Sequence, residues 1–257
     1  MIHKTAIIDK KAKIEKDVEI GPHVIIGPNV IIHSGVVIQH HACVDNHTEI
    51  HNDVNIFPFA SVGSDPQDLK FKKGDEAYCT VGKRTVIREF VTINAGSKKD
   101  HITQIGSDCL LMAYSHLGHN AVIGNHVIIA NVGTLAGHVH IDDNAIVGGL
   151  VGIHQFVKVG KMVIVGGCSK VVKDIPPFML ADGNPAEVRG INKIGLRRHN
   201  YTTKQSAAIK DAYKILYRSK LTRPQALKKL QDLTEEIPEV GDILDFIAKS
   251  NRGITKG

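Results

Sequence analysis

The stretch from residue 8 to residue 43, IDKKAK IEKDVE IGPHVI IGPNVI IHSGVV IQHHAC, sets the architecture of the chain. Each of its six hexads opens with isoleucine, and aliphatic residues continue this period from Ile2 to Val62. A second ladder of the same period runs from Ile105 to Val171, and in most hexads a small or β-branched residue stands four places after the ladder residue. A period of six is neither the 3.6 of an α-helix nor the 2 of a long strand. Each hexad is therefore predicted to be a short strand plus a turn, with two inward side chains.

Repeats of this kind wind into a solenoid. Three hexads close one triangular coil of 18 residues, and stacked coils should rise by about 4.8 Å, the spacing of neighbouring strands. Such a solenoid resembles the hexapeptide-repeat acyltransferases, whose left-handed parallel β-helix is an exception among parallel crossovers. We therefore predict a mainly β fold built on a left-handed parallel β-helix.

The ladder is interrupted twice. After Val62 it resumes at Val81, so Ser64-Asp65-Pro66-Gln67-Asp68-Leu69-Lys70 and the charged residues that follow are predicted to leave the coil as a loop. A second loop is predicted at Ser97-Lys98-Lys99-Asp100, where the ladder skips one position and returns in frame. Loops on a rigid scaffold often carry binding groups.

A different pattern begins after the ladder ends at Val171. Pro176 and Pro177 oppose further strands because proline cannot donate a hydrogen bond to a sheet. Capping-box sequences at Thr202 and Thr222 predict two helices, and a third is expected near residue 245. The predicted apolar positions are Ile209, Ala212, Ile215 and Leu216, then Ala226, Leu227, Leu230 and Leu233, then Ile243, Leu244, Phe246 and Ile247. We predict a β-helix domain over residues 1–177 and a C-terminal α-helical domain over residues 178–257.

The composition excludes several classes of protein. No stretch approaches the ~20 apolar residues that span a bilayer, and the first residues lack the apolar core of a signal peptide. We expect a cytoplasmic protein without stable membrane insertion. The four scattered cysteines lack a CxxC pair and indicate reduced thiols. A net charge of +6 without tryptophan favours a phosphorylated ligand or an acidic carrier protein over nucleic acid.

The position of a histidine within its coil predicts which histidines lie close together. Division of the residue number by 18 leaves a remainder of 10 to 12 for a group on consecutive coils, namely His119, Gly137, His138, His154 and Gln155. These residues are predicted to line one edge of the prism as a stacked column of imidazoles. Imidazole, whose unperturbed pKa is about 6.5, can take a proton near neutral pH and act as a general base. Most other histidines are interpreted as solvated polar residues on turns.

A histidine column can instead bind a metal ion. This keeps open an alternative function, a metal-dependent hydratase like the γ-class carbonic anhydrases that share the fold. Those proteins use an HxxxxH spacing with a third histidine from a neighbouring subunit, whereas His116-Leu117-Gly118-His119 is HxxH. A non-catalytic scaffold is disfavoured because it would need neither the two loops nor the histidine column.

Several segments resemble those of one family in order along the chain. They are Ile56-Phe57-Pro58-Phe59-Ala60-Ser61-Val62-Gly63, Pro66-Gln67-Asp68-Leu69-Lys70, Ile87-Arg88-Glu89, His116-Leu117-Gly118-His119, Leu135-Ala136-Gly137-His138, His154-Gln155-Phe156, Val165-Gly166-Gly167-Cys168-Ser169, Asp174-Ile175-Pro176-Pro177, Gly183-Asn184-Pro185 and Ala212-Tyr213-Lys214. Together they are similar to the UDP-N-acetylglucosamine 3-O-acyltransferases. The resemblance implies transfer of a 3-hydroxyacyl group from acyl carrier protein to the 3-position of UDP-N-acetylglucosamine or its 3-amino analogue, the first step of lipid A synthesis.

The resemblance also implies roles for individual residues. His119 would be the general base on the sugar hydroxyl, and the Gly137 N–H would stabilise the oxyanion. The residues implied to bind substrate are Gln67, Asp68 and Lys70 on the sugar and pantetheine side, His116, His138, His154 and Gln155 on the sugar, diphosphate and acyl ends, and Asn192 and Arg198 on the nucleotide. Gly167 would leave the acyl groove open. No metal or other cofactor is expected.

Two departures from the family pattern affect these roles. Many members place aspartate after the catalytic histidine, whereas this chain has Asn120, which can accept a hydrogen bond but supplies no charge. Position 94 is Asn, and Ala95-Gly96-Ser97 replaces the usual Arg-Gly-Thr, so the first loop is expected to bind its ligand differently. The flat faces of an untapered repeat further predict a homotrimer with sites between subunits.

Overall fold

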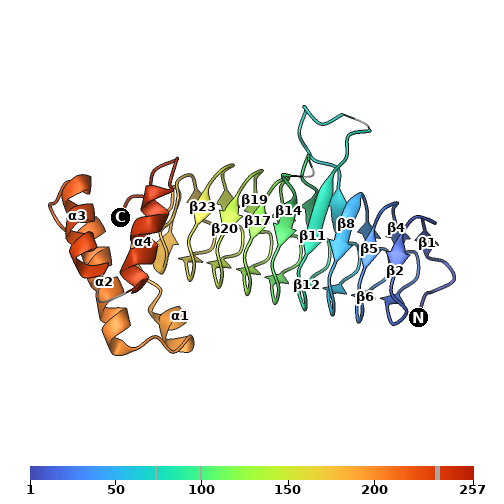
Figure 1. Ribbon diagram of the computed structural model, residues 1–257, viewed down its shortest axis with the longest axis horizontal. Coiled ribbons are helices and arrows are strands. Elements are labelled where there is room, and N and C mark those ends of the chain that lie inside the picture. The colour runs from blue at the N-terminus through green and yellow to red at the C-terminus, as the bar shows by residue number, and fades with distance from the viewer. Residues whose placement is uncertain (73, 99, 235–237) are drawn as a thin grey trace.

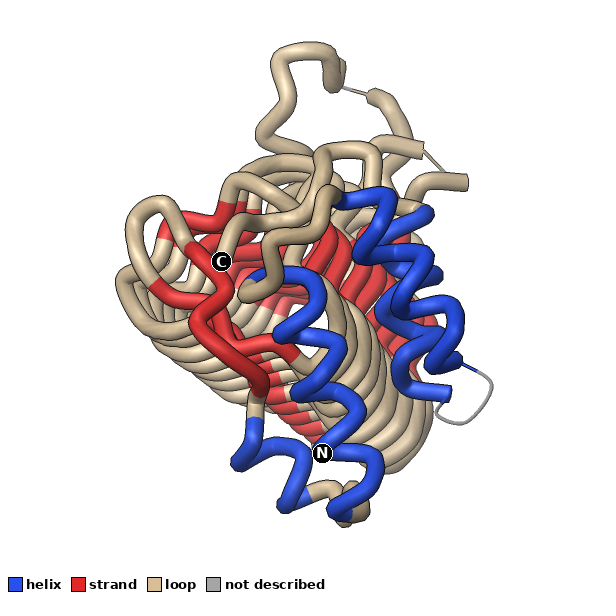
Figure 2. Tube along the Cα trace, turned by 90° about the vertical axis from the view of Figure 1, so that its left-hand side faces the viewer, coloured by secondary structure: helices blue, strands red, loops and turns tan. Residues whose placement is uncertain are grey.

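The computed structural model describes residues 1–257 except 73, 99 and 235–237, and the side chains of Leu233 and Thr234 are also outside the description. The chain forms a long left-handed β-helix that carries its helices at the C-terminal end, with the N-terminus at the opposite end (Figure 1). Seen along its axis, the coils lie behind one another as a triangular prism (Figure 2). The predicted fold class is confirmed.

Short strands from successive hexads form the three faces of the prism, each a sheet in which strands of consecutive coils pair. The first face contains β1 (Ile7–Ile8), β4 (Ile25–Ile26), β7 (Cys43–Val44), β10 (Ser61–Ser64), β13 (Thr92–Asn94), β16 (His116–Leu117), β19 (Thr134–Leu135), β22 (Gly152–Ile153) and β25 (Lys170–Val171). The second face contains β2 (Lys13–Ile14), β5 (Ile31–Ile32), β8 (His47–Ile50), β11 (Tyr78–Val81), β14 (Thr103–Ile105), β17 (Val122–Ile123), β20 (His140–Ile141) and β23 (Lys158–Val159). The third face contains β3 (Glu19–Ile20), β6 (Val37–Ile38), β9 (Asn55–Ile56), β12 (Val86–Ile87), β15 (Leu110–Leu111), β18 (Ile128–Ile129), β21 (Ile146–Val147), β24 (Ile164–Val165), β26 (Met179–Asp182) and β27 (Glu187–Ile191).

The strand register confirms the predicted coil length. Ile123 pairs with Ile141, eighteen positions further on, and both side chains are at most 1% exposed. Burial of each such side chain stabilises the fold by about 1.5–3 kcal/mol. Ile2 also belongs to the ladder but is 53% exposed, because no described coil covers that end of the prism. The ladder is therefore the core wherever a coil has neighbours on both sides.

The corners of the prism depend on residues in the left-handed backbone region. Asn120, His138 and Phe156 have φ angles of 61°, 60° and 64° and stand at the same corner of consecutive coils. This conformation costs a non-glycine residue roughly 1–2 kcal/mol, which burial of the ladder side chains offsets. Side chains at such positions can stack from coil to coil, as the rings of His138 and Phe156 do.

Both predicted loops leave the prism between consecutive strands. Ser61 pairs with Thr92, thirty-one positions further on and thirteen more than one coil, so residues 65–77 form the insertion that stands out in Figure 1. β12 pairs with β15 at an offset of twenty-four, six more than one coil, and the second loop spans residues 95–102. Lys99, where the ladder skips a position, lies outside the described residues.

Backbone pairing continues beyond the end of the hexad ladder. Ile175 forms a parallel bridge with Val159, and β26 pairs in parallel with β24 before β27 turns back antiparallel. Pro176 and Pro177 therefore end the repeat without ending the third sheet. The division of the chain at residue 177 stays a prediction.

Four helices are described after the last strand. They are α1 (Lys193–Arg198), α2 (Thr203–Tyr217), α3 (Arg223–Thr234) and α4 (Pro238–Ala248). The predicted capping box at the start of α2 is confirmed, with Thr202 and Gln205 exchanging both hydrogen bonds. Before α3, the Thr222 N–H donates to the Gln225 side chain at 2.9 Å. No described helix has the length and apolar character needed to cross a membrane.

The last three helices bury the apolar faces that were predicted for them. Ile209, Leu230 and Ile243 are fully buried, one on each helix. The side chain of Leu233, also predicted on the α3 face, lies outside the described residues. The Lys161 Nζ lies 2.5 Å from a carboxylate oxygen of Asp242, which fastens α4 to the C-terminal end of the prism. The helices thus cover the C-terminal end of the β-helix.

Candidate active site

The predicted catalytic residues lie on one corner of the prism, between the first and second faces. Residues 118–121, 136–139 and 154–157 form this corner on three consecutive coils, and we call it the histidine edge. The strands β16, β19 and β22 lead into it, and β17, β20 and β23 lead out of it. Division by the coil length therefore located the edge correctly.

His119 is held in one orientation by Asn120. The Nδ1 atom of His119 lies 2.7 Å from Asn120 Oδ1. The Nδ2 of the same amide donates to the His101 carbonyl, which sets the direction of the amide, and the Asn120 backbone N–H donates to Thr103 Oγ1 at 2.8 Å. With Oδ1 facing the ring, the neutral tautomer of His119 donates from Nδ1, and its acceptor nitrogen is Nε2. The Asn120 amide thus accepts a hydrogen bond from His119 but supplies no charge to the ring.

Gly137 lies directly against the free edge of this imidazole. A Cβ added at Gly137 would lie 2.7 Å from His119 Nε2, a contact that real side chains do not make. Among the hydrogen bonds between described residues, none uses the Gly137 N–H, whereas the next N–H, that of His138, donates to the His119 carbonyl at 2.9 Å. The Gly137 N–H is therefore available to an oxygen atom that is brought beside Nε2.

The stack on this edge continues through His138 and then differs from the prediction. The ring centroids of His119 and His138 are 5.2 Å apart, and those of His138 and Phe156 are 4.6 Å apart with nearly parallel planes. His154 is exposed, and its Nδ1 bonds to the carbonyl of Gln155 at 3.1 Å. The predicted imidazole column is corrected here, because Phe156 takes the left-handed corner position that stacks on His138, and His154 stands two positions before it.

The first loop brings a carboxylate to the histidine edge. Burial and the neighbouring imidazoles lower the pKa of His138, although the Asp68 carboxylate acts in the opposite direction. His138 is therefore neutral at pH 7 and can both donate and accept a hydrogen bond. Asp68 Oδ1 accepts the backbone N–H of Lys70 at 3.0 Å, and the side chains of Gln67 and Lys70 are exposed. These positions suit contact with a substrate that covers the edge.

His116 lies on the first face, two residues before the corner. Its Nδ1 lies 2.8 Å from Thr92 Oγ1, and burial lowers its pKa. Burial favours the uncharged imidazole, so His116 is a neutral hydrogen-bonding group at pH 7. His116 can therefore hydrogen-bond a substrate without adding a positive charge to the strand that leads into the histidine edge.

The depressed pKa of His116 predicts a pH dependence of stability. Because the pKa in the folded state lies below the unfolded value of about 6.5, the unfolded chain takes up the proton first, and stability is lost as the pH falls below about 6.5. The substitution His116→Gln should reduce that loss. Urea unfolding at about pH 7.5 and pH 5.5 measures it, with exposed His154→Gln as the control. Equal acid sensitivity of His116→Gln and the unsubstituted protein would contradict the prediction.

Three predicted site residues lie elsewhere on the same chain. Gly167 stands at the corner between the third and first faces, whereas Asn192 and Arg198 line a cleft of about 580 Å³ beside α1. The Asn192 side chain accepts the N–H of Gly195 at 2.9 Å and donates to the Met162 carbonyl at 2.8 Å. Asn192 therefore caps α1, and its role toward a nucleotide stays a prediction.

Sequence reasoning missed two residues, one on the histidine edge and one on the first face. Phe156 shares its remainder of 12 with His138, so the coil arithmetic could have found the ring that stacks there. Thr92, the partner of His116, lies twenty-four positions before it because the second loop intervenes, and division by 18 does not relate the two.

The fold and the edge together define a class of protein. A left-handed β-helix of hexapeptide coils, with an oriented histidine beside a free backbone N–H, is suited to transfer of a group to a hydroxyl or amine. A family model described as bacterial transferase hexapeptide (six repeats) matches residues 1–34, 11–46 and 102–133. A second, described as UDP-N-acetylglucosamine O-acyltransferase, domain 2, matches residues 174–255.

Comparison with known proteins narrows the class. The acyl-[acyl-carrier-protein]–UDP-N-acetylglucosamine O-acyltransferase of Verminephrobacter eiseniae is 44% identical over 209 residues, 79% of each chain. The solved UDP-N-acetylglucosamine acyltransferase of Bacteroides fragilis is 42% identical with a TM-score of 0.96 and full coverage of both chains. That of Francisella novicida is 36% identical with a TM-score of 0.98, covering 100% of this chain and 94% of the other. The chain therefore belongs to the UDP-N-acetylglucosamine O-acyltransferase family.

Proposed function

We propose that the protein transfers a 3-hydroxyacyl group from acyl carrier protein to the 3-position of UDP-N-acetylglucosamine or its 3-amino analogue, in the first step of lipid A synthesis. The name of the Verminephrobacter eiseniae relative gives the donor and acceptor classes. The observation that carries the mechanism is the orientation of His119, whose Nδ1 is held by Asn120 while Nε2 faces Gly137.

In this mechanism His119 moves one proton. The acceptor oxygen or nitrogen attacks the thioester carbon while Nε2 of His119 takes its proton. The carbonyl oxygen becomes an oxyanion, which the Gly137 N–H stabilises by a hydrogen bond. Collapse of the tetrahedral intermediate breaks the carbon–sulfur bond, and the protonated imidazole returns the proton to the leaving thiolate. His119 ends the cycle in the state in which it began.

Substrate binding falls to the groups around His119. Gln67, Asp68 and Lys70 of the first loop face the sugar and the pantetheine arm. Neutral His138 and His116 hydrogen-bond the sugar without repelling the imidazolium that forms on His119. In addition, His154 and Gln155, one coil further on, serve the more distant parts of the substrate.

Acyl transfer with two matched acceptors tests this function. The purified protein is incubated with a 3-hydroxyacyl carrier protein and with either the 3-hydroxyl or the 3-amino UDP-sugar, and the products are identified by mass spectrometry. We expect transfer to at least one acceptor and much slower transfer from a donor without acyl carrier protein. No transfer to either sugar would sink the proposal. Carbonic anhydrase activity abolished by His119→Ala would favour the hydratase alternative.

The acyl chain is proposed to lie along the corner of Gly167. A Cβ at Gly167 would stand 3.2 Å from the Gly149 carbonyl oxygen, so two glycines one coil apart leave a strip without side chains. The substitution Gly167→Met should shift preference toward shorter chains by tenfold or more, since each excluded methylene is worth about 0.8 kcal/mol. Competition between donors of different length measures the shift. An unchanged profile would place the acyl groove elsewhere.

A shared site would explain why the predicted residues are dispersed over one chain. The histidine edge, the Gly167 corner and the cleft beside α1 lie on different sides of the prism. We propose a homotrimer in which these parts of different subunits meet, with flat faces packed together. Mass measurement in solution gives the oligomeric state. A monomer with full activity would contradict the proposal.

A further inference from the structure

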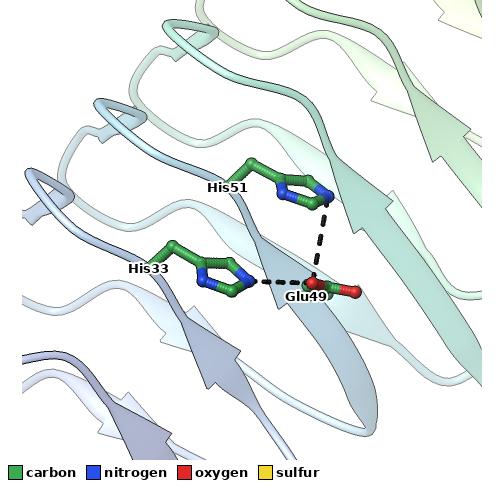
Figure 3. A group of neighbouring side chains, drawn as sticks. All are labelled: His33, Glu49 and His51. Atoms are coloured by element: carbon green, nitrogen blue, oxygen red, sulfur yellow. Dashed lines mark hydrogen bonds and ion pairs between the residues drawn. The ribbon is translucent and has the colours of Figure 1, made fainter.

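Three side chains on the second face converge far from the histidine edge, in the N-terminal coils (Figure 3). His33 follows β5, Glu49 lies on β8, and His51 follows β8. The Nε2 atoms of His33 and His51 lie 2.8 Å and 4.0 Å from Glu49 Oε1, and the ligand atoms of all three residues lie within 4.8 Å of one another. Figure 3 shows both rings directed toward the carboxylate.

The coil repeat builds this arrangement. His33 and His51 are eighteen residues apart, and their rings stack with centroids 5.2 Å apart and planes 7° from parallel. Glu49 is paired in register with Ile31 and alternates with the buried Thr48, so its side chain points outward between the two imidazoles. Paired strands fix the backbone around the three ligand atoms. These residues therefore lose little conformational freedom when an ion binds.

A fourth residue orients the first imidazole. The Nδ1 of His33 lies 3.0 Å from a carboxylate oxygen of Glu15, which follows β2 one coil earlier. Metal-binding histidines in proteins almost always donate their second ring N–H to a carboxylate, a carbonyl or a water. Glu15 thus stands where such a supporting carboxylate stands, and Nε2 of His33 is the nitrogen directed toward Glu49 and His51.

We propose that His33, Glu49 and His51 bind a divalent transition-metal ion of the zinc type. Two imidazoles and one carboxylate are a common set of three protein ligands for Zn²⁺, with water in the fourth position. Tetrahedral bonds of about 2.0–2.2 Å place ligand atoms about 3.3–3.6 Å apart. The observed 2.8 Å and 4.0 Å separations lie on either side of this range, so shifts below about 1 Å adapt these two contacts.

Charge and solvent access agree with this site. The side chains of His33, Glu49 and His51 are 27%, 38% and 37% exposed, so an ion can enter and keep a water ligand. Two carboxylates, Glu15 and Glu49, balance the charge of a divalent ion. The ion would tie consecutive coils together near the N-terminal end.

Zinc titration with matched variants tests the site. Competition with a chromophoric chelator gives the affinity and stoichiometry for ZnCl₂ in the intact protein, His51→Gln, Glu49→Gln and Glu15→Gln. We expect one zinc ion per chain at this site, a loss of at least tenfold in affinity for His51→Gln and Glu49→Gln, and a loss of about 10- to 100-fold for Glu15→Gln. The control, His40→Gln, removes a nearby exposed histidine and should leave the affinity unchanged.

A second measurement separates this site from other histidines. Zinc should raise the Tm of the intact protein and of His119→Ala, but not that of His51→Gln, since an ion that binds the folded state stabilises it. Circular dichroism without metal establishes that His51→Gln is folded. The proposal is overturned if His51→Gln and Glu49→Gln keep the full affinity, or if His119→Ala rather than His51→Gln abolishes the effect of zinc.

Discussion

The substitution His119→Ala is expected to lower kcat by about 100- to 10,000-fold, the usual contribution of a general base. The reason is geometric, because Asn120 orients the imidazole so that Nε2 faces Gly137, beside the proposed position of the acceptor. Alanine at this position removes the proton acceptor but leaves the sugar-binding groups of the loop in place. The affinity for the UDP-sugar should therefore change little, which calorimetric titration of the variant would measure alongside steady-state rates.

The neighbouring histidines provide the comparison for this variant. Because neutral His138 is proposed to bind substrate, His138→Ala should weaken binding as well as rate, in contrast to His119→Ala. If His119→Ala kept a tenth or more of the turnover at saturating substrate, the base would have to be assigned to His116 or His138.

The substitution Gly137→Ala is expected to lower kcat by about 100-fold. Its Cβ would lie 2.7 Å from His119 Nε2 and 2.8 Å from the adjacent ring carbon, so the imidazole must move from its observed position. Displacement of a catalytic group by about 1 Å costs a factor of this order. The same methyl group would also crowd the N–H that is proposed to stabilise the oxyanion. Steady-state kinetics of acyl transfer measure the loss.

Gly152→Ala is the matched control for this substitution. Gly152 lies on β22, one coil further along, and a Cβ added there meets no atom of the chain within 4 Å. It should therefore retain stability and turnover. Equal activity of Gly137→Ala and Gly152→Ala would show that the close approach of Gly137 to the imidazole has no part in catalysis.

The fold could be predicted because its determinants repeat in the sequence. Each ladder residue faces the same environment as its neighbours eighteen positions away. One period therefore predicts the sheet to which a residue belongs, the coil in which it lies and whether its side chain is buried. The strands β26 and β27 and helix α1 were not predicted, because no repeat specifies them. Asn192 caps α1 only through contacts with Gly195 and with Met162, thirty residues earlier, and such contacts leave no local pattern.

The histidine edge was predictable for the same reason, and the other parts of the site were not. The coil arithmetic brought His119 and Gly137 together without any knowledge of the chemistry. It would also have related Glu15, His33 and His51, which share a remainder of 15, although these N-terminal histidines were interpreted as solvated turn residues. Gly167 and Arg198 were assigned by resemblance alone, and an intrachain period says nothing about how separate subunits meet.

The coil of eighteen residues also makes length a quantised property of this protein. Removal or addition of a whole coil returns every inward side chain to its own face, whereas other changes within the prism rotate the core pattern relative to the three walls. The thirteen extra residues of the first loop and the six of the second lie outside the prism, so neither insertion changes the phase of the coils. Divergence within this architecture should therefore lengthen or shorten the prism in steps of one coil. Such steps would change the distance between the N-terminal end and the histidine edge. The residues of the end and of the edge would keep their own contacts.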